Sequence, residues 1–293
     1  MTGATPISAL PAGATVLYGV DFTSSPRSRK PITVAAGRLA GTTIVLDTLE
    51  RLADWPAFDA LLARPGPWLG GFDFPFGLPR EAVIDLGWPQ TWAALVEHCS
   101  ALGRQAFRER LDTYRETRPA GRRYAHRAAD GPARSHSPLK LVNPPVGLMF
   151  LEGVPRLLRA GVSVPGLHPA DPVRVAIEAY PGLLARSVTS APYKSDDRAK
   201  QTPARRDARE RIVAALVDGA HPLGLPLSLR ADDRSALVDD ASGDLLDAAL
   251  ALVQAGSCLA AGAPHYGLPA TIDPLEGWIA TVPAPVGRLP EDS

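Results

Sequence analysis

The sequence predicts an α/β fold with a mixed sheet, and two patterns carry this prediction. Short apolar runs rich in β-branched residues, separated by turn residues, fill the N-terminal part and are typical of strands. Beyond residue 54, segments with apolar residues three and four apart are typical of helices, and they alternate with two further apolar runs. The 293 residues are 45% hydrophobic and 21% charged, so the chain can bury a core and is not globally disordered.

The expected strands begin with three apolar runs joined by short turns, over residues 16–24, 30–41 and 42–52. Because the connecting turns are short, these runs predict a three-stranded antiparallel meander. A fourth strand begins "PWLGGFDFPFGLP" (67–79), and a fifth lies in "VRVAIEAYPGLLAR" (173–186).

Helices are expected where apolar residues recur at three- and four-residue spacing. They cover residues 54–64, 80–88, 91–117, 147–161, 203–219 and 239–256. A meander followed by alternating helices and strands places the helices on the faces of the sheet. Right-handed crossovers then place strand four beside strand one and parallel to it, with strand five beyond. This five-strand order, 3-2-1-4-5, is the ribonuclease H-like arrangement, and the pattern alone leaves a flavodoxin-like sheet open.

The chain is expected to form a single domain over residues 15–283, with a helical and loop insertion at about 80–170. Residues 1–14 and 284–293 are expected to be flexible tails. Within the insertion, residues 118–146 are irregular and basic, and a connection of this length is usually functional or disordered. No internal repeat or long low-complexity tract interrupts this organisation.

Several features predict a cytoplasmic protein without a membrane partner. Cys99 and Cys258 have neither metal-finger spacing nor a disulfide framework, which fits a reducing compartment. The N-terminal sequence lacks a basic region followed by an apolar one, so no signal peptide is expected. No run of eighteen or more apolar residues is present, so no membrane-spanning segment is expected.

The formal net charge is zero, but the charges are unevenly distributed. Residues 104–140 contain ten Lys or Arg and four Asp or Glu, whereas residues 232–293 contain ten acids and two arginines. The first region is able to attract a polyanion and the second to collect cations, unless both are simply solvated surface. Tyr114 and Tyr124 lie among the basic residues, which suggests a clamp over a nucleic acid strand.

An aspartate stands at the end of two apolar runs, Asp21 in "YGVDF" and Asp73 in "GGFDFPFG". A buried carboxylate costs several kcal/mol unless a partner compensates its charge. If the two strands are parallel neighbours about 4.8 Å apart, the two carboxylates lie side by side. Like charges this close raise a pKa unless a cation holds both.

Three further acids interrupt apolar segments. Glu178 lies in "VAIEAYPG", and Asp244 and Asp247 lie three apart in "GDLLDAALAL", on one helix face. Oxygen ligands of this kind suit a hard divalent cation such as Mg²⁺. Two such ions about 3.5–4 Å apart activate water and stabilise the leaving oxygen in phosphodiester cleavage.

Each acid also has a structural interpretation that the sequence leaves open. Asp21 and Asp73 can bond the turn residues that follow them. Glu178 can pair with Arg174 or with a buried tyrosine. Asp244 lies near a helix start, where the helix dipole favours an acid.

Five motifs, "GVDFTSSP", "GFDFPFGLP", "EAYPGLLAR", "DLLDAALAL" and "EGWI", together resemble domain-of-unknown-function family 429, which is described as predicted ribonuclease H-like nucleases. The similarity spans about residues 15–283. The more distant resemblance to the Holliday-junction resolvase branch implies one acid on the first strand, one on the fourth and a pair on the last helix. These positions fall at Asp21, Asp73, Asp244 and Asp247. The resolvase branch has glutamate where this chain has Asp73, and the shorter side chain changes the ligand geometry.

These observations predict a divalent-metal-dependent nuclease that hydrolyses phosphodiester bonds of DNA or RNA with metal-activated water, using Mg²⁺ or Mn²⁺. The expected catalytic residues are Asp21, Asp73, Glu178, Asp244 and Asp247. The expected metal ligands are Asp21, Asp73, Asp244 and Asp247. The cations expected to bind substrate phosphates are Arg27, Arg29, Lys30, Lys194, Arg122 and Arg123.

Two other classes of function remain open. "GVDFTSS" partly imitates the phosphate turn of sugar kinases and actin-like ATPases, although the chain is short for two lobes and lacks a second glycine-rich phosphate loop. The third class is a non-catalytic nucleic-acid-binding or scaffold protein on the same fold. The five acids in apolar segments argue against this third class.

Overall fold

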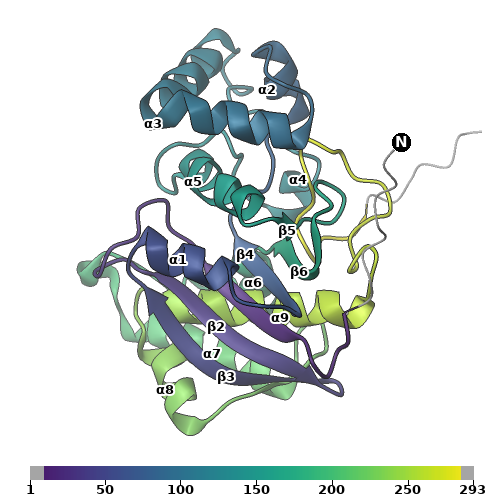
Figure 1. Ribbon diagram of the computed structural model, residues 1–293. Helices are drawn as coiled ribbons and strands as arrows, with labels where there is room; N and C mark the ends of the chain where they lie inside the picture. The colour runs from purple at the N-terminus through teal and green to yellow at the C-terminus, as the bar shows by residue number, and fades with distance from the viewer. Residues whose placement is uncertain (1–9, 285–293) are drawn as a thin grey trace, which may run out of the picture.

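The computed structural model describes residues 10–284, which fold around a seven-stranded mixed sheet (Figure 1). In spatial order the strands are β5 (Val162–Ser163), β6 (Asp171–Glu178), β4 (Trp68–Asp73), β1 (Val16–Asp21), β2 (Ile32–Ala40), β3 (Thr43–Leu52) and β7 (Leu227–Ser228). β2 pairs antiparallel with both β1 and β3, and β4 pairs parallel with β1. The predicted α/β class, the meander and the parallel placement of the fourth strand beside the first are confirmed.

The prediction of a five-stranded sheet in the order 3-2-1-4-5 is wrong for the sheet as a whole, because two short strands extend it at its edges. β5 and β7 contain two residues each and run parallel to β6 and β3, respectively. A two-residue strand is too short to show the period-two alternation that identifies strands in a sequence.

Helices were expected in six segments, and each of these contains a helix. The α-helices of the described residues are α1 (Trp55–Leu62), α2 (Arg80–Asp85), α3 (Trp92–Thr117), α4 (Asp130–Ala133), α5 (Val146–Arg159), α6 (Pro181–Val188), α7 (Pro203–Asp218), α8 (Ala231–Asp239) and α9 (Asp244–Ala261). In the chain, α2 to α5 lie between β4 and β6, where the insertion was expected. Of the expected tails, residues 1–9 and 285–293 lie outside the described residues.

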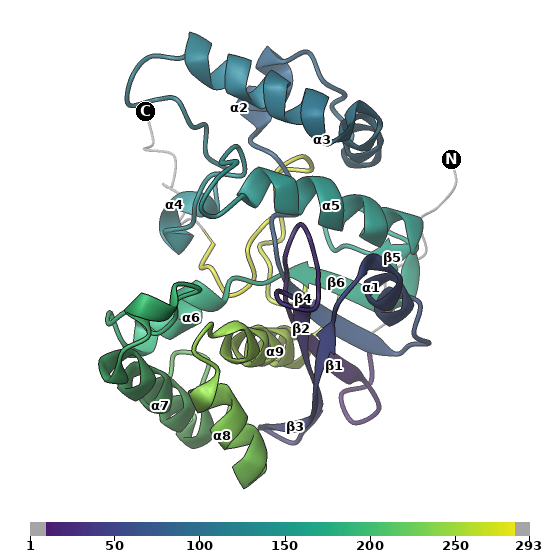
Figure 2. The ribbon, with the colours of Figure 1, turned by 90° about the vertical axis from the view of Figure 1, so that its left-hand side faces the viewer.

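The helices cover the two faces of the sheet differently. α9 lies along one face, with α6, α7 and α8 on its outer side, whereas α1 and the insertion helices α3 and α5 lie on the other side (Figure 2). The alternation of side chains along each strand separates two cores. Leu17 and Leu69 belong to the core under α9, and Val20 and Phe72 belong to the core shared with α1, α3 and α5.

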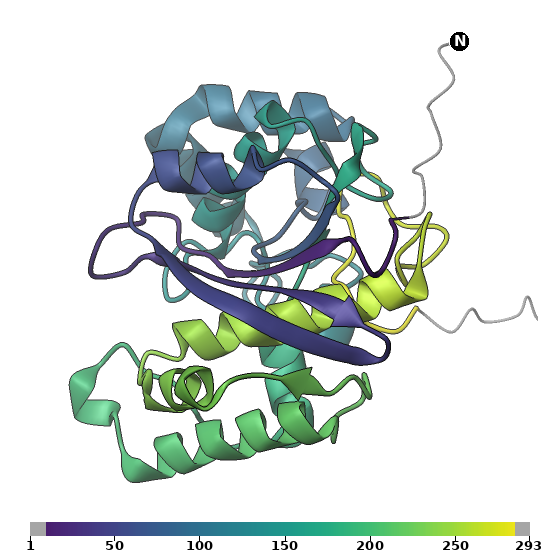
Figure 3. The ribbon, with the colours of Figure 1, turned by 60° about the horizontal axis from the view of Figure 1, so that its bottom comes forward.

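Close contact between α9 and the sheet requires glycine at two strand positions (Figure 3). A Cβ atom on Gly19 would lie 2.1 Å from the carbonyl oxygen of Ala248 and from the amide nitrogen of Leu252. A Cβ atom on Gly71 would lie 2.8 Å from the carbonyl oxygen of Ala251. Any other residue at these positions would therefore push the helix away from β1 and β4.

Of the helices in the described part of the chain, α9 alone is long and apolar enough to cross a membrane by length and composition. Most of it is buried against the sheet and the neighbouring helices, which is common for the core helix of a folded domain. The expectation that no segment spans a membrane therefore stays a prediction.

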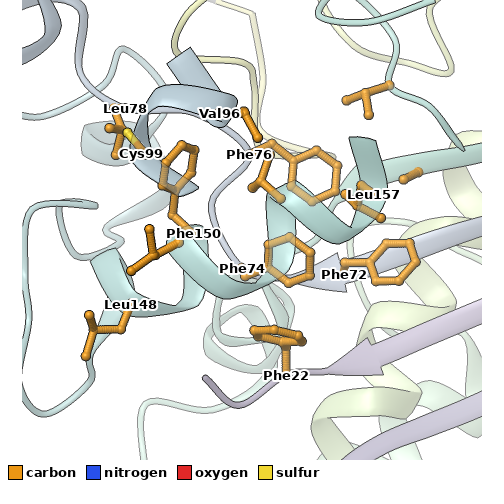
Figure 4. Packing of buried hydrophobic residues seen from close by; sticks show 14 of the residues in the cluster. Phe22, Phe72, Phe74, Phe76, Leu78, Val96, Cys99, Leu148, Phe150 and Leu157 are labelled. Carbon is orange, nitrogen blue, oxygen red and sulfur yellow. The ribbon is translucent and has the colours of Figure 1, made fainter. Parts of the chain in front are cut away.

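Aromatic side chains fix the loop that follows β4 (Figure 4). Phe74 and Phe76 are both buried, with ring centroids 5.2 Å apart, and Phe22 packs 4.5 Å from Phe74. The indole nitrogen of Trp92 donates a hydrogen bond of 2.7 Å to the carbonyl oxygen of Phe76. Burial of each phenylalanine contributes roughly 1.5–3 kcal/mol. The backbone directly after Asp73 is therefore held in one conformation.

Candidate functional site

The carboxylates of Asp21 and Asp73 lie side by side at the ends of two neighbouring parallel strands. The two residues are direct partners in the register of β1 and β4. Neighbouring strands lie about 4.8 Å apart, and in-register side chains point to the same face. Each aspartate follows its strand's glycine, Gly19 or Gly71, by two residues, so both carboxylates lie on the face that α9 covers.

The N-terminus of α9 brings two more carboxylates to this point. Asp244 and Asp247 both lie in the first turn of the helix, where the helix dipole favours negative charge. The hydroxyl group of Thr33 on β2 donates a hydrogen bond of 2.8 Å to the backbone oxygen of Asp244. The carboxylate of Asp240 accepts a bond of 2.9 Å from the amide of Leu245. The first bond fastens the start of α9 to the sheet, and the second fastens it to the residue that follows α8.

Two lysines neutralise the carboxylates of α9. The ammonium group of Lys30 lies 2.9 and 3.1 Å from the two carboxylate oxygens of Asp244. The ammonium group of Lys194 bonds Oδ2 of Asp247, while the hydroxyl of Tyr193 donates a bond of 2.6 Å to Oδ1. Lys30 and Lys194 were predicted to bind substrate phosphates, and both lie among the predicted metal ligands.

Asp21 and Asp73 differ from these acids, because no described residue donates a hydrogen bond to either carboxylate. Burial, together with repulsion by Asp244 and Asp247, raises the pKa of Asp21 well above its ordinary value. Burial likewise raises the pKa of Asp73 to about 7, although attraction by Lys194 opposes the shift. The structural alternative for both residues, a bond to the following turn, is not found in residues 10–284.

Glu178 is occupied by a different partner. The guanidinium group of Arg127 donates two hydrogen bonds of 2.7 Å to the two carboxylate oxygens of Glu178, and the amide of Phe76 donates a third, of 2.8 Å. Arg127 also bonds Asp130, and all three charged side chains are buried. The alternative that Arg174 pairs with Glu178 is wrong, since Arg174 bonds Asp171. Glu178 therefore ties the insertion to the sheet edge.

A cavity of about 630 Å³ opens over these side chains. Asp21, Asp73, Asp244, Lys30 and Lys194 line one part of it. Other parts of the wall come from the insertion and from the region of α6, through His136, Pro144, Met149, Tyr180 and Arg186. A cavity of this size with converging polar groups is the usual form of a ligand site.

The other predicted phosphate-binding residues lie outside this cavity. Arg27 and Arg29 are exposed in the turn between β1 and β2, and Arg122 and Arg123 are exposed in the segment after α3. None of the four is among the described residues that line the cavity. The structure brings together four of the predicted acids and two of the six predicted cations.

Of the two tyrosines expected to form an aromatic clamp, only Tyr124 is exposed. Tyr114 is buried, and its hydroxyl donates a bond of 2.9 Å to Asp85, so the prediction that its ring stacks on a nucleic acid is wrong. Tyr124 is exposed, and the guanidinium group of Arg115 lies 5.2 Å from its ring centroid. Helical periodicity places Tyr114 on the inner face of α3, where packing rather than the charge of its neighbours decides its role.

The chemistry of the donors fits a divalent cation. Carboxylate oxygens are the ligands that Mg²⁺ and Mn²⁺ take, and Asp21 and Asp73 offer two carboxylates to which no side chain or amide of residues 10–284 donates a hydrogen bond. Within residues 10–284, no group of three or more His, Cys, Asp or Glu side chains is already arranged around a common point. Asp244 and Asp247 are each bonded to a lysine, Lys30 and Lys194, respectively. Asp21 and Asp73 are therefore the residues that would hold a cation.

Arg127 and Tyr193 were missed by the sequence reasoning. Arg127 is one of ten cations in the basic region 104–140, and nothing in the local sequence separates it from the exposed ones. Tyr193 directly precedes Lys194 in "APYKSDD", and that adjacency was the available signal.

Comparison of the chain with protein-family models, with curated proteins and with solved structures finds no match in any of the three. The resemblance to family 429 therefore stays an expectation that rests on short motifs.

Proposed function

We propose that this protein is a divalent-metal-dependent hydrolase of phosphodiester bonds in nucleic acid, built on a ribonuclease H-like core. The observation that carries this proposal is the register of Asp21 and Asp73. These two half-buried carboxylates lack partners among the described residues and lie side by side at a cavity with two lysines. Such an arrangement is electrostatically unfavourable unless a cation is bound.

The pairing of the longer strands supports the ribonuclease H-like part of the proposal. β3, β2 and β1 form an antiparallel meander, and β4 and β6 follow beside β1 as parallel strands. Acids from β1, from β4 and from the last helix meet at one sheet edge, which is the arrangement that the resemblance to the resolvase branch implies.

Different residues of the cavity would bind the cation and the substrate phosphate. Asp21 and Asp73 would hold the cation, and Lys30 and Lys194 supply positive charge for a phosphate in the cavity. A bound Mg²⁺ or Mn²⁺ would polarise the phosphate and activate the attacking water. In the reaction, a water oxygen bonds to phosphorus, the bond from phosphorus to one sugar oxygen breaks, and that oxygen takes up a proton. The products are a phosphomonoester and a free hydroxyl.

The test is hydrolysis of fluorescently labelled single-stranded DNA, duplex DNA and RNA with Mn²⁺, Mg²⁺ or EDTA. We expect metal-dependent cleavage that falls by about 100-fold or more in Asp21→Asn and in Asp73→Asn, because the cation contributes several kcal/mol to the transition state. Asp47→Asn is the matched control, since Asp47 is exposed on β3 and pairs with Arg38 outside the cavity.

Cleavage that persists in EDTA or in Asp21→Asn would contradict the proposal. Release of ADP from ATP without cleavage of any nucleic acid would indicate the phosphotransferase. Tight binding of an oligonucleotide without turnover would indicate the non-catalytic protein.

A further inference from the structure

We propose that the ammonium group of Lys194 takes the place of a second divalent cation, so that the site binds one ion, between Asp21 and Asp73. This inference rests on the proposed function and deepens it. A pair of ions would require Asp21 to bridge them, with Asp73 completing one position and Asp247 the other. The second of these positions already holds the charge of Lys194.

Both carboxylate oxygens of Asp247 are already bonded to other side chains. Its side chain is fully buried, and both carboxylate oxygens have partners, Tyr193 on Oδ1 and Lys194 on Oδ2. Both oxygens of Asp244 lie within 3.1 Å of the ammonium group of Lys30. Only Asp21 and Asp73, among the four carboxylates, are free of such contacts within the described residues.

Hydrogen bonds hold the backbone around Lys194. Arg209 is buried and donates a bond of 2.7 Å to the carbonyl oxygen of Tyr193, and Arg205 donates to that of Lys194 itself. The amide of Ser195 donates a bond of 3.1 Å to the carbonyl oxygen of Ala241. Lys194 therefore starts from a backbone held at three consecutive residues, and its ammonium group reaches the buried Asp247 although 45% of its side chain is exposed.

Gly243 makes room for the stem of this lysine. A Cβ atom on Gly243 would lie 2.6 Å from Cβ and 3.3 Å from Cδ of Lys194. Gly243 directly precedes α9 and has a positive φ of 79°, a conformation that glycine adopts without strain. Gly243, the residue just before α9, is therefore also the residue against which Lys194 packs.

The formal charge of the site also favours a single divalent cation. The four carboxylates and the two lysines carry a formal charge of minus two when all are ionised, and one divalent cation balances it. A second divalent cation would leave an excess of two positive charges in the same volume. Asp196 also contacts Lys30, but its side chain is 73% exposed and water screens its charge.

The number of bound ions tests this inference. We expect titration calorimetry to give one Mn²⁺ per chain for the wild type, and electron paramagnetic resonance to show an isolated ion rather than a spin-coupled pair. Lys194→Met removes the ammonium group while keeping much of the stem, so we expect it to bind two ions. Lys200→Met is the matched control and should still bind one, because Lys200 pairs with the exposed Asp197.

Two ions in the wild type, or one ion in Lys194→Met, would overturn the inference. Either result leaves the proposed function standing if cleavage is metal-dependent. Absence of both Mn²⁺ binding and cleavage overturns the inference and the proposed function together. If Lys194→Met does not fold, the resonance spectrum of the wild type decides the question without a variant.

Discussion

Two sets of acids lie at the C-terminal ends of neighbouring strands, and they differ in whether a partner compensates their charge. Glu178 at the end of β6 receives two bonds from Arg127 and one from a backbone amide, and it is 4% exposed. Asp21 and Asp73 at the ends of β1 and β4 receive no hydrogen bond from the described residues. Glu178 is therefore a buried acid whose charge is compensated by its partners, whereas Asp21 and Asp73 are half-buried acids without such partners among the described residues.

The physical consequence differs for the two sets. In a buried ion pair with good geometry, removal of one partner leaves the other charge uncompensated in a medium of low dielectric constant. The loss of one partner therefore strongly lowers the free energy of unfolding. A buried carboxylate without a partner instead responds by binding its proton more tightly, which is the direction found for Asp21 and Asp73. The paired acid, Glu178, stabilises the fold. In contrast, ionisation of Asp21 and Asp73 is unfavourable, and a bound cation would make it favourable.

The strongest test of this comparison is Arg127→Met. We expect the variant to lose about 3–5 kcal/mol in the free energy of unfolding, because Glu178 and Asp130 would remain buried without their counter-charge. Urea denaturation followed by circular dichroism measures the change. Arg206→Met is the control and should cost less than about 1 kcal/mol, since Arg206 and its partner Asp239 are both more than half exposed.

A loss of less than about 1 kcal/mol in Arg127→Met would show that Glu178 and Asp130 tolerate burial without the arginine. The distinction between the two sets of acids would then have no energetic basis.

The next effect in size is the pH dependence of stability without metal. The native state keeps a proton on Asp73 up to about pH 7, whereas the unfolded chain releases it near the ordinary value of 3.8. Between these values the native state binds more protons, so the free energy of unfolding falls as the pH rises. We expect this fall to be on the order of 2–4 kcal/mol larger in the wild type than in Asp73→Asn, which cannot titrate.

The measurement is a series of urea titrations in EDTA between about pH 4 and pH 7.5, with Asp47→Asn as the control that should follow the wild type. Saturating Mn²⁺ should flatten the difference, because a cation stabilises the ionised carboxylate. Parallel curves for the wild type and Asp73→Asn would mean that Asp73 is solvated rather than strained.

Most of the fold could be predicted because the patterns that specify it are local. Period-two runs mark the long strands, three- and four-residue spacing marks the helices, and short turns make the first strands a meander. The two-residue strands β5 and β7 could not be predicted, because their pairing depends on where the neighbouring strand ends. β7 pairs with β3, which is distant in the chain, whereas β5 pairs with β6 shortly after it, and neither strand is long enough to show the alternation of a strand.

The positions of the acids in the site could be predicted from the sequence, but their hydrogen-bonding partners could not. Asp73 and Glu178 have the same local signal, an acid at the end of an apolar strand, and the sequence gives no reason to separate them. Their roles diverge because Arg127, 51 residues before Glu178, reaches that carboxylate. The pairing of Lys30 with Asp244 spans 214 residues and was equally invisible.

The smallest expected effect comes from the exposed part of the segment that contains Arg127. Arg122→Ala combined with Arg123→Ala should change the free energy of unfolding by less than about 0.5 kcal/mol, because both side chains are exposed. If the pair contacts substrate phosphates, binding of a fluorescent oligonucleotide should weaken, and the slope of log affinity against log salt should fall by about two. An unchanged slope would remove Arg122 and Arg123 from the nucleic-acid surface and leave the cavity lysines as the phosphate-binding cations. Arg127 would then differ from Arg122 and Arg123, in the same basic segment, only because it is close to buried acids that it can bind.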